Sequence, residues 1–168
     1  MMTERVAVYP GTFDPITYGH IDIIKRGVRI FDKIIVAVAN NMHKSPIFNV
    51  EERKNLIKNI ISQDNIKNVD VDSFDGLLVD YLKQKNAKII IRGLRVVTDF
   101  DYEFVYSMMN KKLYNEIETV FLMASEKYSF ISSTLIKEVT KFGGDISSYS
   151  PGIVIEKLKE KYNKEANK

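Results

Sequence analysis

The chain has 168 residues, of which 45% are hydrophobic and 28% are charged, a composition typical of one globular domain with a substantial core. It has no cysteine, which excludes disulfides, thiolate metal sites and cysteine nucleophiles, and its two histidines cannot by themselves complete a zinc site. The N-terminus has no apolar signal segment and no apolar run approaches the ~20 residues that span a bilayer, so we expect a cytoplasmic protein with no membrane partner.

The net charge of +3 is concentrated at the C-terminal end. Residues 156–168 contain five Lys and three Glu, which gives +2 and leaves the rest of the chain near neutral at +1. We expect this Lys-rich segment to be a solvated helical tail. No basic stripe runs along the rest of the chain, so we expect no nucleic-acid partner.

The chain begins with a pattern typical of a strand, a tight turn and a helix. Residues 6–9 form a short apolar run that ends at Pro10-Gly11, and apolar residues recur at helical spacing over 19–31. His20 therefore lies in the first turn of a helix, where free backbone N–H groups and the helix dipole favour a phosphate. The glycine spacing is neither that of a dinucleotide fold nor that of a P-loop, which indicates another phosphate chemistry.

Strands and helices alternate along the rest of the chain. We expect Met and aromatic residues of the helix at 99–115 to pack in the interior. The alternation predicts an α/β fold, a single doubly wound parallel five-stranded sheet flanked by helices, in one domain over 1–168. The further strands are expected at 33–39, 68–74, 87–91 and 118–123, and the further helices at 49–63, 76–85, 99–115, 135–141 and after Pro151.

Several of these strands are followed by candidate phosphate ligands. Lys44 lies in the loop after the second strand, Arg92 and Arg95 flank a glycine after the fourth, and the hydroxyl-rich segment 125–134 follows the fifth. Taken alone, Lys44 fits an ordinary surface lysine, and the serines of 125–134 fit simple N-capping. Because the carboxyl ends of parallel strands share one edge of a sheet, the convergence of these groups predicts a phosphate site there.

Three segments together resemble the phosphopantetheine adenylyltransferase family, and the match spans most of the chain. The Thr-x-Gly-His element at 17–20 alone marks only the wider nucleotidylyltransferase superfamily, and the other two segments narrow the resemblance. The three segments are Tyr-Pro-Gly-Thr-Phe-Asp-Pro-Ile-Thr-Tyr-Gly-His at 9–20, Ile-Arg-Gly-Leu-Arg at 91–95 with Asp-Phe-Asp-Tyr-Glu at 99–103, and Tyr-Ser-Phe-Ile-Ser-Ser-Thr at 128–134.

The resemblance implies a Rossmann-like nucleotidylyltransferase fold and transfer of the adenylyl group of ATP to 4'-phosphopantetheine, giving dephospho-coenzyme A and pyrophosphate. A phosphate oxygen of the acceptor attacks the α-phosphorus in line, so the enzyme supplies position and positive charge and forms no covalent intermediate. Mg²⁺ bridging the ATP phosphates fits this need, and no side chain is expected to ligate it. The family also implies coenzyme A as a feedback ligand and a homohexamer with helices near 99–115 at subunit contacts.

Matching positions imply roles for individual residues. Thr12 orients the acceptor phosphate, Lys44 and Arg92 hold phosphate charge, and His20 contacts the α-phosphate of ATP in the transition state as a donor rather than as a base. The acceptor's arm is expected to contact Leu78, Tyr106, Met109 and Asn110. The ATP site is expected to comprise Thr12, Phe13, His20, Gly93, Leu94, Arg95, Glu103, Tyr128, Ser129, Phe130, Ile131, Ser132, Ser133 and Thr134. Position 128 is often Trp in the family, so Tyr128 is expected to change the adenine-side packing.

Two other classes of function stay open. A different nucleotidylyltransferase on the same scaffold would use CTP, or accept nicotinamide mononucleotide or glycerol phosphate, and only the second and third segments argue against it. A non-catalytic nucleotide-binding regulator is disfavoured because a sensor need not retain Thr12, His20, Lys44 and Arg92 together.

Overall fold

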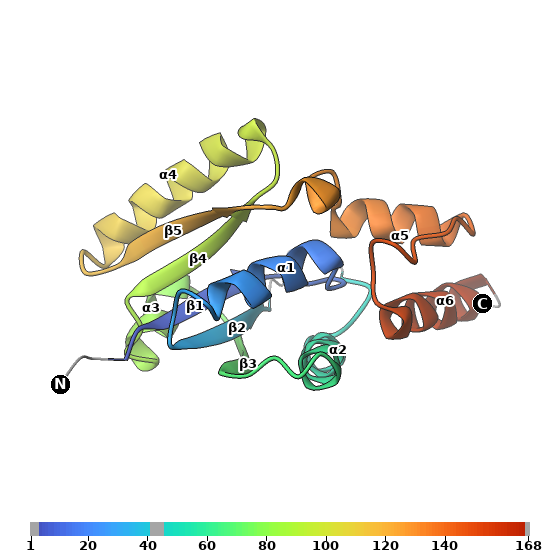
Figure 1. Cartoon of the computed structure of the whole chain (residues 1–168), viewed down its shortest axis with the longest axis horizontal. Helices are drawn as coiled ribbons and strands as arrows, with labels where there is room; N and C mark the ends of the chain where they lie inside the picture. Colours follow the sequence, from blue (N-terminus) through green and yellow to red (C-terminus); the bar gives the residue numbers. More distant parts are fainter. Residues whose placement is uncertain (1–3, 41–45, 167–168) are drawn as a thin grey trace.

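The fold is a five-stranded parallel sheet with helices on both faces (Figure 1). The computed structural model describes residues 4–40 and 46–166. The elements in chain order are β1 (Val6–Gly11), α1 (Tyr18–Gly27), β2 (Lys33–Ala39), α2 (Val50–Gln63), β3 (Val69–Phe74), α3 (Leu78–Gln84), β4 (Ile89–Leu94), α4 (Val97–Leu113), β5 (Glu118–Met123), the short 3-10 helix η1 (Glu126–Tyr128), α5 (Ser133–Lys141) and α6 (Gly152–Ala166).

The strand order is β3-β2-β1-β4-β5, and every neighbouring pair is parallel. The predicted doubly wound parallel sheet is therefore confirmed. The order reverses at β1, which pairs with β2 on one side and β4 on the other. In open α/β sheets, ligands bind beyond the carboxyl ends of the strands at such a switch point, which here is the turn that follows β1.

The central strands are buried on both faces, as their continuous apolar runs require. On β1, Ala7 and Tyr9 pack into a core that they share with residues of α1 and α2, whereas Val8 packs into a second core under α3. The larger core continues beyond the carboxyl edge of the sheet into α5 and α6, which lie to one side of the strands (Figure 1). These two helices therefore form a wall beside the turn after β1.

The helix ends follow local hydrogen-bond chemistry. Asn49 caps α2, because its side chain accepts from the N–H three residues later at 2.9 Å. Ser132 caps α5 in the same way at 3.0 Å, so this helix begins at residue 133 and not at the predicted 135. Helix α1 ends at Gly27, short of the predicted 31, because the next N–H groups bond three residues back instead of four: Arg29 N–H bonds the Arg26 carbonyl at 3.1 Å and Ile30 N–H bonds the Gly27 carbonyl at 2.9 Å.

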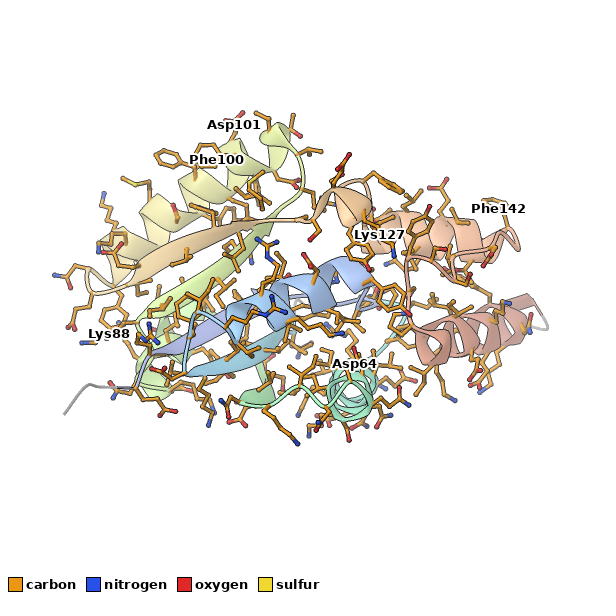
Figure 2. All side chains as sticks on the ribbon, viewed as in Figure 1. Asp64, Lys88, Phe100, Asp101, Lys127 and Phe142 are labelled. Atoms are coloured by element: carbon orange, nitrogen blue, oxygen red, sulfur yellow. The ribbon has the colours of Figure 1, made fainter. Side chains whose placement is uncertain are left out.

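Helix α4 contradicts the expectation that its Met and aromatic residues pack in the interior. None of its residues is buried within this chain, and the side chain of Val97 is 83% exposed. Figure 2 shows Phe100 of α4 at the surface of the molecule. The other large apolar residues exposed on this helix are Tyr102, Phe104, Val105, Tyr106, Met108, Met109 and Leu113.

Helix α6 carries most of the Lys-rich segment. Val154 and Leu158 are completely buried in the larger core, whereas the Lys157 side chain is half exposed. The helix is therefore anchored through its apolar side, and lysines project from its other side. In the part of the chain that the structure describes, no helix combines the length and the apolarity that crossing a bilayer requires.

Candidate active site

The turn between β1 and α1 is built around the buried ring of Phe13. This ring packs beneath Gly11, where an added Cβ would lie 2.9 Å from Phe13 Cζ, so the turn needs a glycine there. The same ring stands edge-on to Tyr9 and to His20, with ring centroids 5.3 and 5.1 Å apart. The imidazole of His20 therefore packs against the aromatic rings of Phe13 and Tyr9.

The first turn of α1 fixes the tautomer of His20. The backbone N–H of Thr17 donates to His20 Nδ1 at 3.1 Å, and Thr17 Oγ1 lies 3.1 Å from the same atom. Because a backbone N–H can only donate, Nδ1 is the acceptor and the ring proton sits on Nε2. Burial, with the positive charges of Arg95 and Arg92, lowers the pKa of His20 to about 4. At neutral pH the ring is uncharged and offers one N–H.

A cavity of about 470 Å³ opens between this turn and α5, and we call it the α5 cavity. It is rich in hydroxyls and cations, and it includes the capped N-terminus of α5, whose free N–H groups favour an anion. Its lining residues are Thr12, Phe13, Asp14, His20, Pro46, Arg95, Ile131, Ser132, Ser133, Thr134 and Lys137.

A second cavity of about 790 Å³ lies between the sheet edge, α3 and α4, and we call it the α4 cavity. It combines apolar and aromatic side chains with charged ones, among them the ion-paired Arg92 and Glu103. Its lining residues are Pro10, Gly11, Thr12, Ala39, Asn40, Phe74, Asp75, Gly76, Leu77, Leu78, Ile90, Arg92, Tyr102, Glu103, Tyr106, Ser107, Asn110 and Thr119. Thr12 lines both cavities, so the two meet at the turn after β1.

Arg92 stands where the α4 cavity approaches this junction. Its Nε and Nη2 atoms donate to the Glu103 carboxylate, and Nη1 donates to the Pro10 carbonyl at 2.9 Å. Each Nη atom of a guanidinium carries a pair of N–H groups and uses one of them here, so Arg92 keeps donors for a further anion. The Glu103 carboxylate fixes the plane of that fork.

Arg95 connects β4 to the segment before α5. Its Nε and Nη2 donate to Asp99 at 3.2 and 3.1 Å, and its Nη1 donates to the Ile131 carbonyl at 3.1 Å. Burial alone would raise the pKa of the Asp99 carboxyl, but the hydrogen bonds and the charge of Arg95 outweigh it and lower that pKa. Arg95 therefore holds the hydroxyl-rich segment against the end of β4 and adds positive charge to the α5 cavity.

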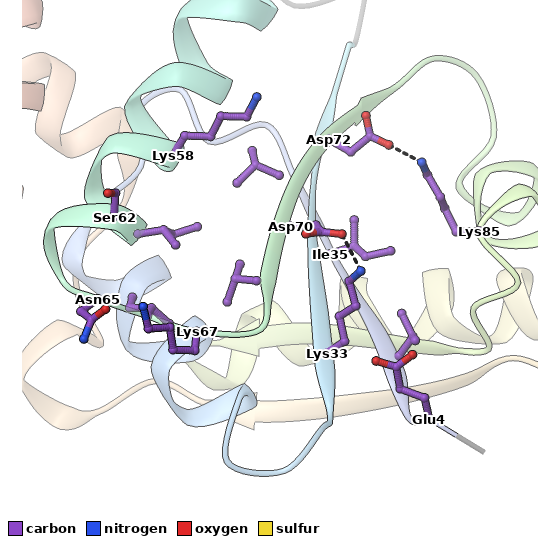
Figure 3. A pocket seen from close by; sticks show the side chains of 15 residues that line it. Glu4, Lys33, Ile35, Lys58, Ser62, Asn65, Lys67, Asp70, Asp72 and Lys85 are labelled. Carbon is purple, nitrogen blue, oxygen red and sulfur yellow. Dashed lines mark ion pairs between the residues drawn. The ribbon is translucent and has the colours of Figure 1, made fainter. Parts of the chain in front are cut away.

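A third cavity, of about 920 Å³, lies elsewhere, along edge strand β3 (Figure 3). Two of its lysines already form ion pairs, Lys33 with Asp70 at 2.7 Å and Lys85 with Asp72 at 2.6 Å. None of the predicted site residues that the structure describes lines it. The α5 and α4 cavities are therefore the candidates for the active site.

The chain is similar to known proteins over most of its length. The cytidylyltransferase-like family matches residues 8–139, which include the turn, both arginines and most of α5. The phosphopantetheine adenylyltransferase of Caldanaerobacter subterraneus subsp. tengcongensis is 56% identical over 160 residues, 95% of this chain and 99% of the relative. The chain belongs to the phosphopantetheine adenylyltransferase family.

Other relatives agree with this assignment and with the fold. The phosphopantetheine adenylyltransferase of Dictyoglomus turgidum is 56% identical over 156 residues, 93% of this chain and 96% of that protein. A solved structure, the nicotinic acid mononucleotide adenylyltransferase of Plasmodium falciparum complexed with NaAD, has a TM-score of 0.71. It covers 96% of this chain and 97% of its own, and at 18% identity it shows the shared fold alone. The family resemblance inferred from the three sequence segments is confirmed.

The cavities bring together most of the residues expected in a phosphopantetheine adenylyltransferase site. The α5 cavity collects Thr12, Phe13, His20, Arg95, Ile131, Ser132, Ser133 and Thr134, and the α4 cavity collects Thr12, Leu78, Arg92, Glu103, Tyr106 and Asn110. Lys44 lies outside the described residues.

Some expected residues of the phosphopantetheine adenylyltransferase site line neither cavity. Gly93 faces α1, because an added Cβ would lie 3.2 Å from Ile23 Cγ1. Leu94 is buried, and Met109 is exposed on α4. The others are Tyr128, whose ring lies 6.1 Å from that of Tyr18, with Ser129 and the exposed Phe130.

Sequence reasoning missed three residues of the α5 cavity, Pro46 and the charged pair Asp14 and Lys137. Asp14 is a buried carboxylate that accepts from Ile47 N at 3.1 Å, Phe48 N at 3.0 Å and Lys137 Nζ at 2.8 Å. Lys137 lies one helical turn after Ser133, which places it on the same side of α5 as the helix start. That spacing was the available signal for Lys137, and the position of Asp14 directly after the Thr12-Phe13 pair was the signal for Asp14.

Within residues 4–40 and 46–166, no group of three His, Asp or Glu side chains is placed to hold a metal ion. Asp14 is the one carboxylate that lines the α5 cavity, and its oxygens already accept from two backbone N–H groups and a lysine. This donor set fits a Mg²⁺ ion held mainly by substrate phosphates, as Mg²⁺ commonly is.

Proposed function

We propose that the chain transfers the adenylyl group of ATP to 4'-phosphopantetheine, giving dephospho-coenzyme A and pyrophosphate. The observation that carries this proposal is its 56% identity to relatives named phosphopantetheine adenylyltransferase over nearly their whole length. The geometry supports it, because a cation-rich cavity and a partly apolar cavity meet at Thr12. An enzyme that joins a nucleotide to a phosphorylated arm needs these two compartments side by side.

The reaction is an in-line displacement. An oxygen of the acceptor phosphate forms a bond to the α-phosphorus of ATP, and the bond to the pyrophosphate oxygen breaks. The chain contributes alignment of the two anions and donors for the charge that develops. Nε2–H of His20 acts as a neutral donor to the α-phosphate, which agrees with the tautomer fixed by Thr17. When bound, Mg²⁺ supplies further charge neutralisation among the ATP phosphates.

We assign the ATP phosphates to the α5 cavity and the pantetheine arm to the α4 cavity. Thr12 at the junction orients the acceptor phosphate, and Arg92 and Lys44 hold its charge. The arm contacts Leu78, Tyr106, Met109 and Asn110. Within the α5 cavity the nucleotide contacts Thr12, Phe13, His20, Arg95, Ile131, Ser132, Ser133 and Thr134. We also assign to it Glu103, which lines the α4 cavity beside Arg92, and five residues that line neither cavity: Gly93, Leu94, Tyr128, Ser129 and Phe130.

We further propose that the protein is a cytoplasmic homohexamer. The support is the exposed apolar surface of α4, on which Val97, Tyr102 and Val105 are each more than 60% exposed. An apolar surface of this kind on a soluble monomer marks an interaction site. We propose coenzyme A as a feedback ligand, since it shares the pantetheine arm and would compete for the α4 cavity.

Pyrophosphate release from purified protein tests the function. The assay contains Mg²⁺ and ATP with phosphopantetheine, and parallel reactions replace ATP by CTP or the acceptor by nicotinamide mononucleotide or glycerol phosphate. Release that requires both ATP and phosphopantetheine is the expected result. Release only with another pair would reassign the acceptor cavity, and silence with all pairs while ATP still binds would indicate a regulator.

A further inference from the structure

Arg53 of α2 is a buried arginine that the proposed mechanism does not yet use. Its side chain is 1% exposed, and it lies on the apolar stripe of the helix together with Leu56, Ile57 and Ile60. Burial opposes its charge and lowers the pKa of the guanidinium. A buried cation is tolerated when its donors are well paired, so the partners of Arg53 show what the residue is for.

Those partners are backbone carbonyls from three separate segments. Nη1 donates to the Thr12 carbonyl at 2.7 Å and to the Ala39 carbonyl at 3.0 Å. Nε donates to the Phe48 carbonyl at 3.0 Å and to the Asn49 carbonyl at 3.3 Å. No carboxylate of the described chain forms an ion pair with it, so one guanidinium ties the end of β2 and the start of α2 to the turn after β1.

The turn that Arg53 holds contains a strained residue. Phe13 has a positive φ of 48°, in the left-handed region, which costs a non-glycine residue about 1–2 kcal/mol. Such a conformation persists only where the surroundings determine it on both sides. Arg53 fixes the carbonyl of Thr12 before it, and Asp14 after it is fixed by Ile47 N–H, Phe48 N–H and Lys137.

We propose that Arg53 is a positioning residue for the reaction, holding the Thr12-Phe13 turn so that Thr12 and the adjacent backbone face the junction of the two cavities. This inference rests on the proposed function. Displacement of an orienting group by about 1 Å can cost about 100-fold in rate, which makes such a support consequential. The competing explanation is that Arg53 only anchors α2 and affects stability alone.

Two substitutions separate these explanations. Arg53→Met keeps an unbranched apolar stem but removes the guanidinium and every donor, and Arg53→Lys keeps the charge but replaces the planar fork by a single ammonium. The matched control is Ile117→Ala, a buried position before β5 in the other core, which destabilises the fold without contact with the turn. All variants are assayed well below their thermal midpoints, with kcat and KM for both substrates measured separately.

We expect Arg53→Met and Arg53→Lys to lower kcat by about 10- to 100-fold with smaller changes in KM, and Ile117→Ala to lower the thermal midpoint with kcat unchanged. A further variant, Arg53→Ala, leaves space for the missing group, so millimolar guanidinium should restore part of its lost kcat but none of the kcat lost in His20→Ala. A kcat for Arg53→Met within twofold of the wild type would overturn the proposal, as would an equal loss in Ile117→Ala.

The failure of the proposed function has a different signature. If the wild-type chain is silent with ATP and phosphopantetheine, the function is wrong, and calorimetry with ATP then decides the role of Arg53. Weaker ATP binding by Arg53→Met than by the wild type and Ile117→Ala would support the positioning role, because Thr12 and Phe13 line the α5 cavity. Equal ATP affinities in the three proteins would overturn it.

Discussion

The backbone N–H of Thr17 donates to Nδ1 of His20, and this bond leaves Nε2 as the atom that carries the ring proton. The first turn of α1, which contains both residues, thus determines which ring nitrogen of His20 is protonated. The Thr-x-Gly-His spacing therefore has a physical meaning here. It places a donor three residues before an acceptor in the first turn of α1.

Replacement of His20 should lower turnover and spare the fold. We expect His20→Ala to reduce kcat by about 100-fold or more, the scale for loss of one preorganised donor. His20→Gln places an amide N–H near the position of Nε2, whereas His20→Asn does not reach it, so His20→Gln should retain more activity. Steady-state kinetics measures both, and near-normal turnover of His20→Ala would remove this residue from the mechanism.

His20 should also make stability depend on pH. Its folded-state pKa of about 4 lies below the ordinary value of 6.5. Between these values the unfolded chain binds a proton that the folded chain does not, so the contribution is complete above pH 6.5 and declines as the pH falls towards 4. Urea unfolding should show the wild type losing about 2 kcal/mol more than His20→Gln between pH 7.5 and 5. Parallel pH profiles for the two proteins would contradict this.

Removal of Arg92 should chiefly weaken binding of the acceptor phosphate. We expect Arg92→Ala to raise the KM for phosphopantetheine by about 10- to 100-fold, the scale for a lost charge-assisted hydrogen bond. Glu103→Gln keeps the shape of the Arg92 partner but removes its charge, so it should give a smaller effect in the same direction. Calorimetry with the acceptor measures both directly, and an unchanged affinity in Arg92→Ala would refute the assignment.

The exposed surface of α4 should form the subunit contacts of the proposed hexamer. Val105 is 63% exposed within one chain, so a glutamate there can be solvated in the monomer but not in a packed interface. We expect Val105→Glu to raise the dissociation constant of the assembly by about tenfold or more. Light scattering after size-exclusion chromatography detects this, with Ile30→Glu, an exposed position after α1, as control. A wild-type chain that is monomeric would contradict the proposed hexamer.

The sheet could be predicted because it depends on short-range patterns, and the same patterns place the candidate site. The runs 6–9 and 34–39 are apolar at every position, which a strand buried on both faces requires. The alternation of strands and helices then places the carboxyl ends together. The end of α1 could not be placed, because the turn after Gly27 depends on backbone hydrogen bonds that the apolar spacing of 19–31 does not reveal.

Two features resisted prediction because they depend on distant parts of the molecule. The Met and aromatic residues of α4 look like core in one dimension, and their exposure follows only when the rest of the chain leaves that surface uncovered. Arg53 was not singled out, although a charged residue at an apolar-stripe position is a signal that can be read. Its four carbonyl partners come together only through the fold.

Position 11 acts as a spacer for the imidazole. The Gly11 backbone packs directly against the Phe13 ring, and that ring packs against His20, so β1, Phe13 and the imidazole are in continuous contact. A methyl group added at Gly11 would displace the rigid Phe13 ring, and the displaced ring would in turn push the imidazole of His20. The position of the Nε2–H donor of His20 thus depends on the absence of a Cβ atom at Gly11, two residues before Phe13.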